Sequence, residues 1–129
     1  MLKSKHGGVI MRNIKQGLKT TESIWGYPRS DLLDNLGELG EYILDVAFGD
    51  VYSRPGLSLR DRELVTVSML IAQGGADLQL TNHFRGAIHV GLRPEELHEI
   101  IIQSALYNGF PKAIKAEQLL QEVLKELES

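Results

Sequence analysis

The stretch ADLQLTNHFRGAIHVGLRPEELHE, Ala76–Glu99, contains the signals from which the fold of the chain can be inferred. Its apolar residues recur at helical spacing as far as Val90, and Gly91 follows as a residue that easily adopts the positive φ of a helix end. Pro94 then stands where the first turn of a helix tolerates proline, and the two glutamates after it suit the positive end of the helix dipole. The stretch therefore predicts one helix over about 76–90 and the start of another at Pro94.

The remaining chain continues this pattern of apolar helical segments between glycine, proline and serine breaks. Ser58, with Asp61 three residues later, is a predicted N-cap, and Gly74-Gly75 ends the helix that it starts. No segment shows the sustained alternation of a strand. We predict a single all-α domain over residues 1–129, with its first ten or so residues disordered. About six helices in two packed layers are expected, over about 11–24, 31–48, 59–73, 76–90, 94–108 and 111–127.

The composition is that of a soluble globular protein: 43% of the 129 residues are hydrophobic, 24% are charged, and the formal net charge is −3. Basic and acidic residues are interspersed, so we expect neither nucleic acid nor an anionic membrane as a partner. No apolar run reaches the roughly 18 residues that a membrane-spanning helix requires. The N-terminal MLKSKHGGVIMRN lacks the apolar core of a signal peptide, and we therefore expect a cytoplasmic protein.

The absence of cysteine restricts the chemistry that the chain can perform. Without thiols the protein has no disulfides, no thiolate metal sites and no iron–sulfur ligation, and it has no cysteine nucleophile. Peroxidase or hydrolase activity that depends on cysteine is thereby excluded.

His83 has an unusual position for a histidine. At about 100° per residue it shares a helix face with Leu80 and Ala87, so it points toward the core, whereas Arg85 and His89 lie near the opposite face. The two histidines are six positions apart, too far for both to grip one metal ion from a helix, and we predict no metal site. A lone inward histidine is more often a hydrogen-bonded core residue than a catalyst, and the spacing by itself leaves both interpretations open.

Three stretches in the second half of the chain resemble a known family: YSRPGLSLRDRELVTVSMLIA, HFRGAIHVGL and PEELHEIIIQSALYNGFPKAIKA. They contain an R-P-G-L loop at Arg54–Leu57, an R-E-L helix start at Arg62–Leu64, H-x-R-x-A-x-x-x-G at His83–Gly91, and Gln103, Tyr107, Gly109 and Pro111 in register. Together these motifs resemble the carboxymuconolactone decarboxylase family, and the resemblance covers about residues 14–125.

The resemblance implies an all-α domain of the alkyl hydroperoxide reductase D type. In that fold, helices of neighbouring subunits pack together into a homo-oligomer, typically a ring-like hexamer built as a trimer of dimers. Thiol peroxidases of this type place two cysteines ahead of the histidine that matches His83. Those positions fall near Ala76 and Gln79 here, so the chain lacks the peroxidase nucleophile.

The activity that the resemblance implies is decarboxylation of 4-carboxymuconolactone, a small acidic lactone of aromatic-compound catabolism. The alkene conjugated with the lactone carbonyl accepts the electrons that CO2 leaves behind, so we expect no cofactor. His83 is the expected proton donor or oxyanion partner, because histidine titrates near neutral pH. The dianionic substrate suits arginine, and the candidates for binding it are Arg62 and Arg85 first, then Arg54 and Arg60. Tyr107 is expected either to line the pocket or to pack at a helix end.

Glu63 departs from the pattern of the decarboxylases, which usually have serine there, and matches the peroxidase branch, where glutamate forms a proton relay with the histidine. Tyr52, His89-Val90 and Asn108 are further departures. Three hypotheses follow. The protein is a cofactor-free lyase; or it uses Glu63 and His83 as a proton-transfer pair on another small molecule, as an isomerase or hydrolase; or it is a non-catalytic oligomeric protein that binds a small acid.

Overall fold

The computed structural model of the chain describes residues 2–3, 9–10 and 13–129, and most of these residues are helical. The described α-helices are α1 (Ile14–Trp25), α2 (Asp31–Leu36), α3 (Glu38–Tyr42), α4 (Leu59–Gln73), α5 (Asp77–His89), α6 (Pro94–Asn108) and α7 (Phe110–Glu128). A π-helix, η1, covers Ile43–Val51, and two short strands, β1 (Leu2–Lys3) and β2 (Val9–Ile10), pair antiparallel. The all-α prediction is confirmed. The predicted helix start at Met11 and most of the segment predicted to be disordered lie outside the described residues.

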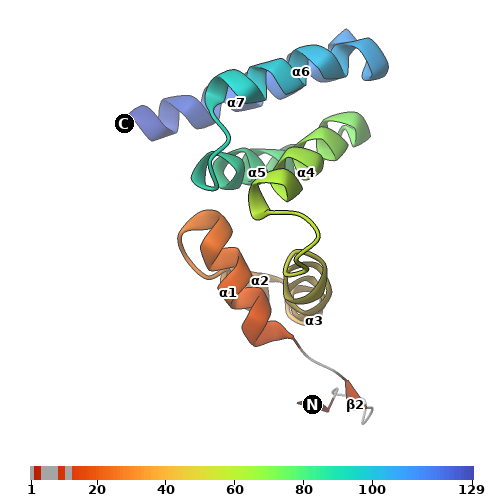
Figure 1. Ribbon diagram of the computed structural model, residues 1–129, viewed down its shortest axis with the longest axis vertical. Helices are drawn as coiled ribbons and strands as arrows, with labels where there is room; N and C mark the ends of the chain where they lie inside the picture. The colour runs from red at the N-terminus through yellow and green to blue at the C-terminus, as the bar shows by residue number, and fades with distance from the viewer. Residues whose placement is uncertain (1, 4–8, 11–12) are drawn as a thin grey trace. The chain divides into compact units, whose positions relative to one another are not determined.

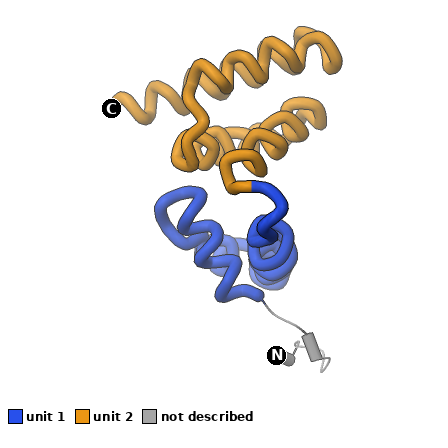
Figure 2. The backbone as a smooth tube through the Cα atoms, in the orientation of Figure 1, with its two compact units in different colours: residues 1–57 blue, residues 58–129 orange. Residues whose placement is uncertain are grey.

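The chain divides into two compact units, Met1–Leu57 and Ser58–Ser129 (Figure 2). The first unit contains α1, α2, α3 and η1, and the second contains α4 to α7. Each unit has buried apolar side chains of its own. Ile24, Leu44 and Phe48 are buried in the first, and a larger cluster draws on all four helices of the second.

In the first unit α1 packs against η1, and a glycine permits their close approach. A Cβ built on Gly17 would lie 2.1 Å from the carbonyl oxygen of Leu44, so no larger residue fits unless one helix moves. The start of α1 is held by the buried Asp45 of η1, whose Oδ1 accepts a hydrogen bond of 2.6 Å from the backbone N–H of Asn13. Both contacts fix α1 on η1.

The single helix predicted over about 31–48 is corrected by the structure to three shorter elements, α2, α3 and part of η1. Gly37 has φ +57° and ψ −125°, a conformation that residues with a Cβ rarely adopt, and it separates α2 from α3. After Tyr42 the chain enters a π-helix, in which hydrogen bonds span five residues. The apolar spacing of this segment is close to helical throughout, and it therefore marks neither interruption.

In the second unit α4 and α5 form one helical hairpin, α6 and α7 form another, and the two hairpins pack as layers (Figure 1). Burying each large aliphatic side chain contributes about 1.5–3 kcal/mol toward the gross stability. The buried large apolar residues of this core are Val67, Ile71, Leu80, Phe84, Leu92, Leu97, Ile101, Leu119, Leu120 and Val123.

The ends of these four helices follow the predicted signals, and their predicted bounds lie within one residue of the observed ones. The Ser58 side chain accepts a hydrogen bond of 3.1 Å from the backbone N–H of Asp61. Gly91 has φ 109° in the turn before α6, and Pro94 is the first residue of that helix. Local signals, namely the Ser58 N-cap, the glycines and prolines at helix ends and the apolar spacing between them, therefore locate α4 to α7.

Candidate active site

Glu63 of α4 and His83 of α5 form a hydrogen-bonded pair across the first hairpin of the second unit. His83 Nδ1 lies 2.8 Å from Glu63 Oε2 and 3.2 Å from Oε1. The Glu63 side chain is fully buried at 0% exposure, whereas the His83 side chain keeps 14% of its surface exposed. The carboxylate is thus withdrawn from solvent, and the imidazole is the member of the pair that a bound molecule can reach.

The positions of the two side chains follow from helical spacing. Glu63 lies four and eight residues before Val67 and Ile71, so it shares the inward stripe of α4 with two core residues. His83 lies three residues after the buried Leu80, on the inward side of α5 as its spacing predicts. Two stripes that face each other across a helical hairpin bring the pair together, although the residues are 20 positions apart.

The pair is suited to moving a proton. A carboxylate only accepts hydrogen bonds, so the shared hydrogen belongs to Nδ1, and Nε2 is the ring nitrogen that can exchange a proton with a substrate. The buried carboxylate also fixes the orientation of the ring. General acid–base chemistry needs these properties.

Arg85 is placed in α5 as predicted, but its guanidinium is held by α7. Its Nη2 lies 2.7 Å and its Nε 3.0 Å from Oε2 of Glu126, and its Nη1 donates to Oδ1 of Asn82 at 3.0 Å. Two residues along an α-helix differ by about 200° in direction, so the side chain of Arg85 points to a different side of α5 from that of His83. The structure therefore joins Arg85 to α7, and none of the bonds described for it reaches Glu63 or His83.

Arg62 and Arg60 lie in the first turn of α4, directly before Glu63. Arg62 is half-buried and precedes the buried carboxylate by one residue. Arg60 forms an ion pair with Glu96 of α6. Arg60 thus contributes to the packing of α4 on α6, and Arg62 is the predicted substrate-binding arginine nearest in the chain to the pair.

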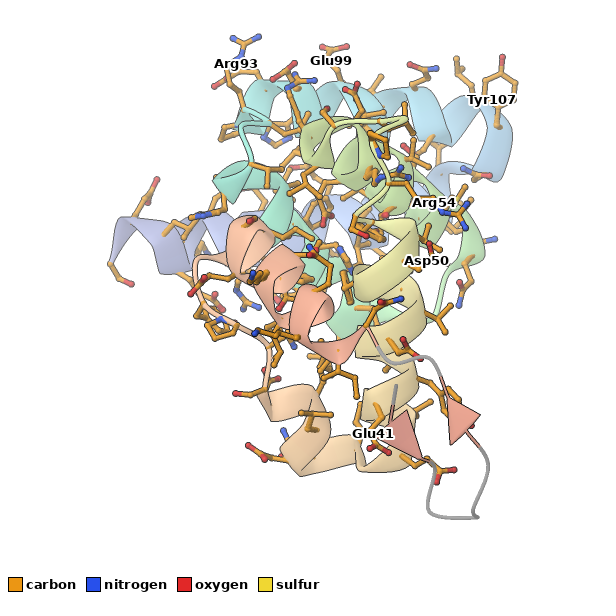
Figure 3. The ribbon with its side chains drawn as sticks, turned by 60° about the horizontal axis from the view of Figure 1, so that its bottom comes forward. Glu41, Asp50, Arg54, Arg93, Glu99 and Tyr107 are labelled. Atoms are coloured by element: carbon orange, nitrogen blue, oxygen red, sulfur yellow. The ribbon has the colours of Figure 1, made fainter. Side chains whose placement is uncertain are left out.

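Arg54 belongs to the first unit, where its Nε lies 3.0 Å from Oδ1 of Asp50 (Figure 3). The hydrogen bond to the Asp50 carboxylate, together with its charge, raises the pKa of Arg54. The arrangement described for Arg54 is an ion pair four residues apart in the chain, of the kind found at helix ends.

Tyr107 lies near the end of α6, with 84% of its surface exposed, and points away from the helix (Figure 3). It borders a hollow of about 320 Å³ between α4 and α6, together with Ser68, Gln103 and Asn108. Neither Glu63 nor His83 lines that hollow. Of the seven predicted site residues, the structure therefore joins only Glu63 and His83 to each other by a described bond.

A second histidine–carboxylate pair was not predicted from the sequence. His98 Nδ1 of α6 lies 2.8 Å from Oε1 of Glu117 in α7, and Gln121 donates to the other oxygen of that carboxylate at 2.7 Å. Both members of the pair are about one third exposed, so this pair lacks the buried carboxylate of Glu63. No local spacing signals it, because Glu117 lies on the next helix.

Four of the pairs between oppositely charged side-chain types in the second unit connect its helices in a closed circuit, called here the ion-pair circuit. Each of the four helices takes part in two of the pairs. The circuit consists of Glu63–His83 (α4 to α5), Arg85–Glu126 (α5 to α7), His98–Glu117 (α7 to α6) and Arg60–Glu96 (α6 to α4).

The part of the chain that the structure describes contains neither a metal-binding cluster nor a membrane-spanning helix. No cluster of three or more histidine, aspartate or glutamate side chains there has the arrangement of a metal site. None of the described helices is long and apolar enough to cross a membrane.

The amino-acid sequence was compared with those of known protein families and proteins. The carboxymuconolactone decarboxylase family matches residues 37–122. The 4-carboxymuconolactone decarboxylase of Acinetobacter baylyi is 36% identical over 118 residues, which make up 88% of this chain and 87% of that protein. The nitrosuccinic acid decarboxylase of Metarhizium robertsii is 37% identical over 87 residues, 67% of this chain and 60% of that protein.

An uncharacterized 15.0 kDa protein of Paracoccus denitrificans is also similar, with 33% identity over 85 residues, 65% of this chain and 63% of that protein. The two relatives named for an activity are both decarboxylases. Because the family match spans more than half of the chain, and the Acinetobacter relative is similar over most of both lengths, the chain belongs to the carboxymuconolactone decarboxylase family.

Proposed function

We propose that the protein is a cofactor-free carboxy-lyase that acts on a small acidic substrate of the 4-carboxymuconolactone type, in aromatic-compound catabolism. The observation that carries the proposal is the pair of a fully buried Glu63 and a partly exposed His83, 2.8 Å apart, in a chain whose named relatives are decarboxylases. The pair supplies a proton donor that can act on a substrate carbon.

The proposed reaction balances without a cofactor. The C–C bond to the departing carboxylate breaks, CO2 leaves, and the electron pair passes through the conjugated alkene to the lactone oxygen as an enolate. Protonated His83 then gives its Nε2 proton to carbon, the electrons return from oxygen, and the imidazole regains a proton from solvent. Glu63 holds the ring in position through Nδ1 during the transfer.

The acids named for the two relatives share the chemistry that this reaction needs. In 4-carboxymuconolactone a lactone accepts the electrons, and in nitrosuccinic acid a nitro group does. Both acids carry two carboxylates. We therefore propose a substrate in which one carboxylate leaves from a carbon that is joined to an electron-accepting group directly or through a conjugated alkene, while the other carboxylate is available for binding.

Arginine is the proposed partner of the retained carboxylate. Arg62 is favoured because it directly precedes Glu63 in α4. Arg85 lies two residues after His83 in α5, where Glu126 of α7 binds its guanidinium. Arg54 and Tyr107 remain proposed binding residues on the strength of their motif positions.

We also propose that the protein is a homo-oligomer, with a hexamer as the expected form. Large apolar side chains are exposed at the end of α6 and the start of α7, which supports burial of this surface against another subunit. This apolar surface consists of Ile102, Leu106, Tyr107, Phe110 and Ile114.

The test is to mix the purified protein with 4-carboxymuconolactone, and separately with nitrosuccinate, and to follow the reaction by ultraviolet absorbance. Wild-type turnover is expected, and His83→Ala should lower kcat by about 10²–10⁴-fold, because a positioned proton donor contributes that much. His98→Ala is the matched control, since it removes the other histidine paired with a glutamate, and it should retain turnover. Equal rates in wild type and His83→Ala would refute the role of His83.

The second candidate function is proton transfer on a different small molecule, as an isomerase or hydrolase. The complete burial of Glu63 against His83 favours it, because a buried carboxylate can serve as the base of a relay. Glu63→Gln keeps the shape of the side chain and should abolish that activity, whereas a lyase should show only a modest loss of kcat. A third outcome, thermal stabilisation by a small acid with no product, would indicate a binding protein.

A further inference from the structure

A cavity of about 470 Å³ opens where the turn between α4 and α5 faces the start of α7. Its wall is mostly apolar and includes Leu70, Leu80, Pro111 and Ala116. A volume of this size lies within the roughly 300–1,000 Å³ that small-molecule sites occupy. Neither Glu63 nor His83 lines the cavity, so it is not the proposed active site.

Two consecutive glycines with positive φ line the cavity, Gly74 with φ 70° and Gly75 with φ 74°. The side chain of Lys112 lies over this turn: a Cβ built on Gly74 would be 3.3 Å from Lys112 Cε. Lys112 Nζ donates a hydrogen bond of 2.8 Å to the carbonyl oxygen of Ala72. That bond uses one of the three N–H donors of the ammonium group and holds its charge beside the opening.

A second lysine reaches the same opening. Lys115 Nζ lies 3.4 Å from Oδ2 of Asp77, and both side chains are about half exposed, at 57% and 48%. An ion pair this long and this exposed contributes little, so a ligand carboxylate can replace Asp77 as the partner of Lys115. Lys112, Lys115 and Asp77 are the charged residues that line the cavity, and together they give its lining a net charge of +1.

We propose that this cavity is a binding site for a small monocarboxylate with an apolar body, such as an aromatic or branched aliphatic acid. The apolar wall accepts the body of the ligand, and the carboxylate lies at the mouth, where Lys115 and Lys112 donate hydrogen bonds to it. One excess positive charge matches a single carboxylate. Neither Glu63 nor His83 lines this site, so the proposal of a carboxylate site does not depend on the proposed lyase activity.

The test uses benzoate as the probe and benzamide as its neutral counterpart of nearly the same shape. Backbone amide signals of the full-length, ¹⁵N-labelled protein are followed by NMR as each compound is added. Benzoate is expected to shift the signals of Gly74, Gly75 and Asp77 in a saturable manner. Benzamide should bind about tenfold more weakly, because it lacks the charge-assisted hydrogen bonds.

Two variants with opposite expected effects separate recognition from damage to the fold. Lys115→Met keeps the apolar part of the side chain and should weaken benzoate binding about tenfold. Asp77→Asn removes the competing carboxylate and should strengthen binding severalfold. Lys125→Met, a control on the same helix but outside the cavity, should leave the affinity unchanged.

Three results would overturn the proposal. Equal affinities for benzoate and benzamide would exclude recognition of the carboxylate. Shifts centred on His83 instead of the α4–α5 turn would place the ligand elsewhere. Absence of any saturable shift at millimolar benzoate would mean that the cavity does not bind this class of ligand.

Discussion

A glutamate that is completely buried in a helical hairpin needs a partner, because moving a carboxylate out of water costs several kcal/mol. Glu63 is such a residue, and His83 Nδ1 at 2.8 Å is its described partner. The interaction explains why a histidine occupies the inward stripe of α5. Thus the two interpretations of His83, hydrogen-bonded core residue and catalyst, are compatible. Nδ1 forms the hydrogen bond to the buried Glu63, and Nε2 is the nitrogen that can exchange a proton with a substrate.

At the scale of single residues, the inward direction of His83 could be predicted from spacing, and the importance of Glu63 from resemblance. The partner of Arg85 could not be predicted, since Glu126 lies 41 positions later on another helix. The pairing of His98 with Glu117 was missed for the same reason. Helical periodicity gives the side of a helix on which a residue lies, but not which residue of a neighbouring helix meets it.

Glu96 gives a prediction about pH. The backbone N–H of Arg93 and then the side chain of Arg60 donate hydrogen bonds to its carboxylate, and these hold the pKa of Glu96 below its ordinary value of 4.5. A lowered folded-state pKa means that the stabilisation is complete above pH 4.5 and is lost as the pH falls through the folded-state value. The stability advantage of wild type over Glu96→Gln should therefore shrink on acidification.

Urea denaturation of both proteins between neutral pH and about pH 3 measures this difference. Glu99→Gln, a change at an exposed glutamate of the same helix, is the control and should run parallel to wild type. Parallel curves for wild type and Glu96→Gln would show that the two hydrogen bonds do not stabilise the charged carboxylate.

At the scale of helices, prediction succeeded where a local chemical signal marks an end and failed where none does. The ends of α4 to α7 are marked by Ser58, by glycines of positive φ and by prolines, and their predicted bounds are accurate. The segment 31–48 contains Gly37, but a glycine within a helical pattern is not by itself evidence of a break. The π-helical part of η1 could not be predicted, because its buried residues Leu44 and Phe48 have the four-residue spacing of an α-helix.

Gly17→Ala tests the close packing of α1 on η1. The added methyl group would collide with the carbonyl oxygen of Leu44, which belongs to a backbone and cannot rotate away. We expect a loss of about 1–3 kcal/mol in the free energy of unfolding, the usual cost of overpacking. Chemical denaturation followed by circular dichroism measures it.

Gly56→Ala is the control for this substitution, because a Cβ at Gly56 meets no atom within 4 Å. Its effect should be within about 0.5 kcal/mol of zero. If Gly17→Ala were equally mild, α1 would not be held against η1 as closely as the structure indicates.

At the scale of the whole molecule, the all-α class and the family were accessible from the sequence, because they depend on patterns spread over most of the chain. The division at Leu57 was not, since the loop there has no length or composition that separates it from the other turns. The family match over residues 37–122 includes part of both units.

The proposed assembly predicts a change in mass. Leu106, 80% exposed on α6, belongs to the apolar surface described above, and Leu106→Glu would place a charge in a buried contact between subunits. Light scattering coupled to size-exclusion chromatography should give a hexamer for wild type and smaller species for the variant. Leu127→Glu, the same change near the end of α7, should leave the mass unchanged, and a monomeric wild type would contradict the proposal.

The ion-pair circuit has a consequence for the register of the helices. Apolar contacts tolerate sliding, because one leucine can replace another in the same groove, but an ion pair is lost when its partners separate. A slip of α5 by one turn, about 5.4 Å, would part His83 from Glu63 and Arg85 from Glu126 in a single movement. Every helix of the unit takes part in two pairs of the circuit, so a one-turn slip of any helix would break both. We therefore expect the circuit to favour the observed alignment of the four helices over alignments shifted by one turn.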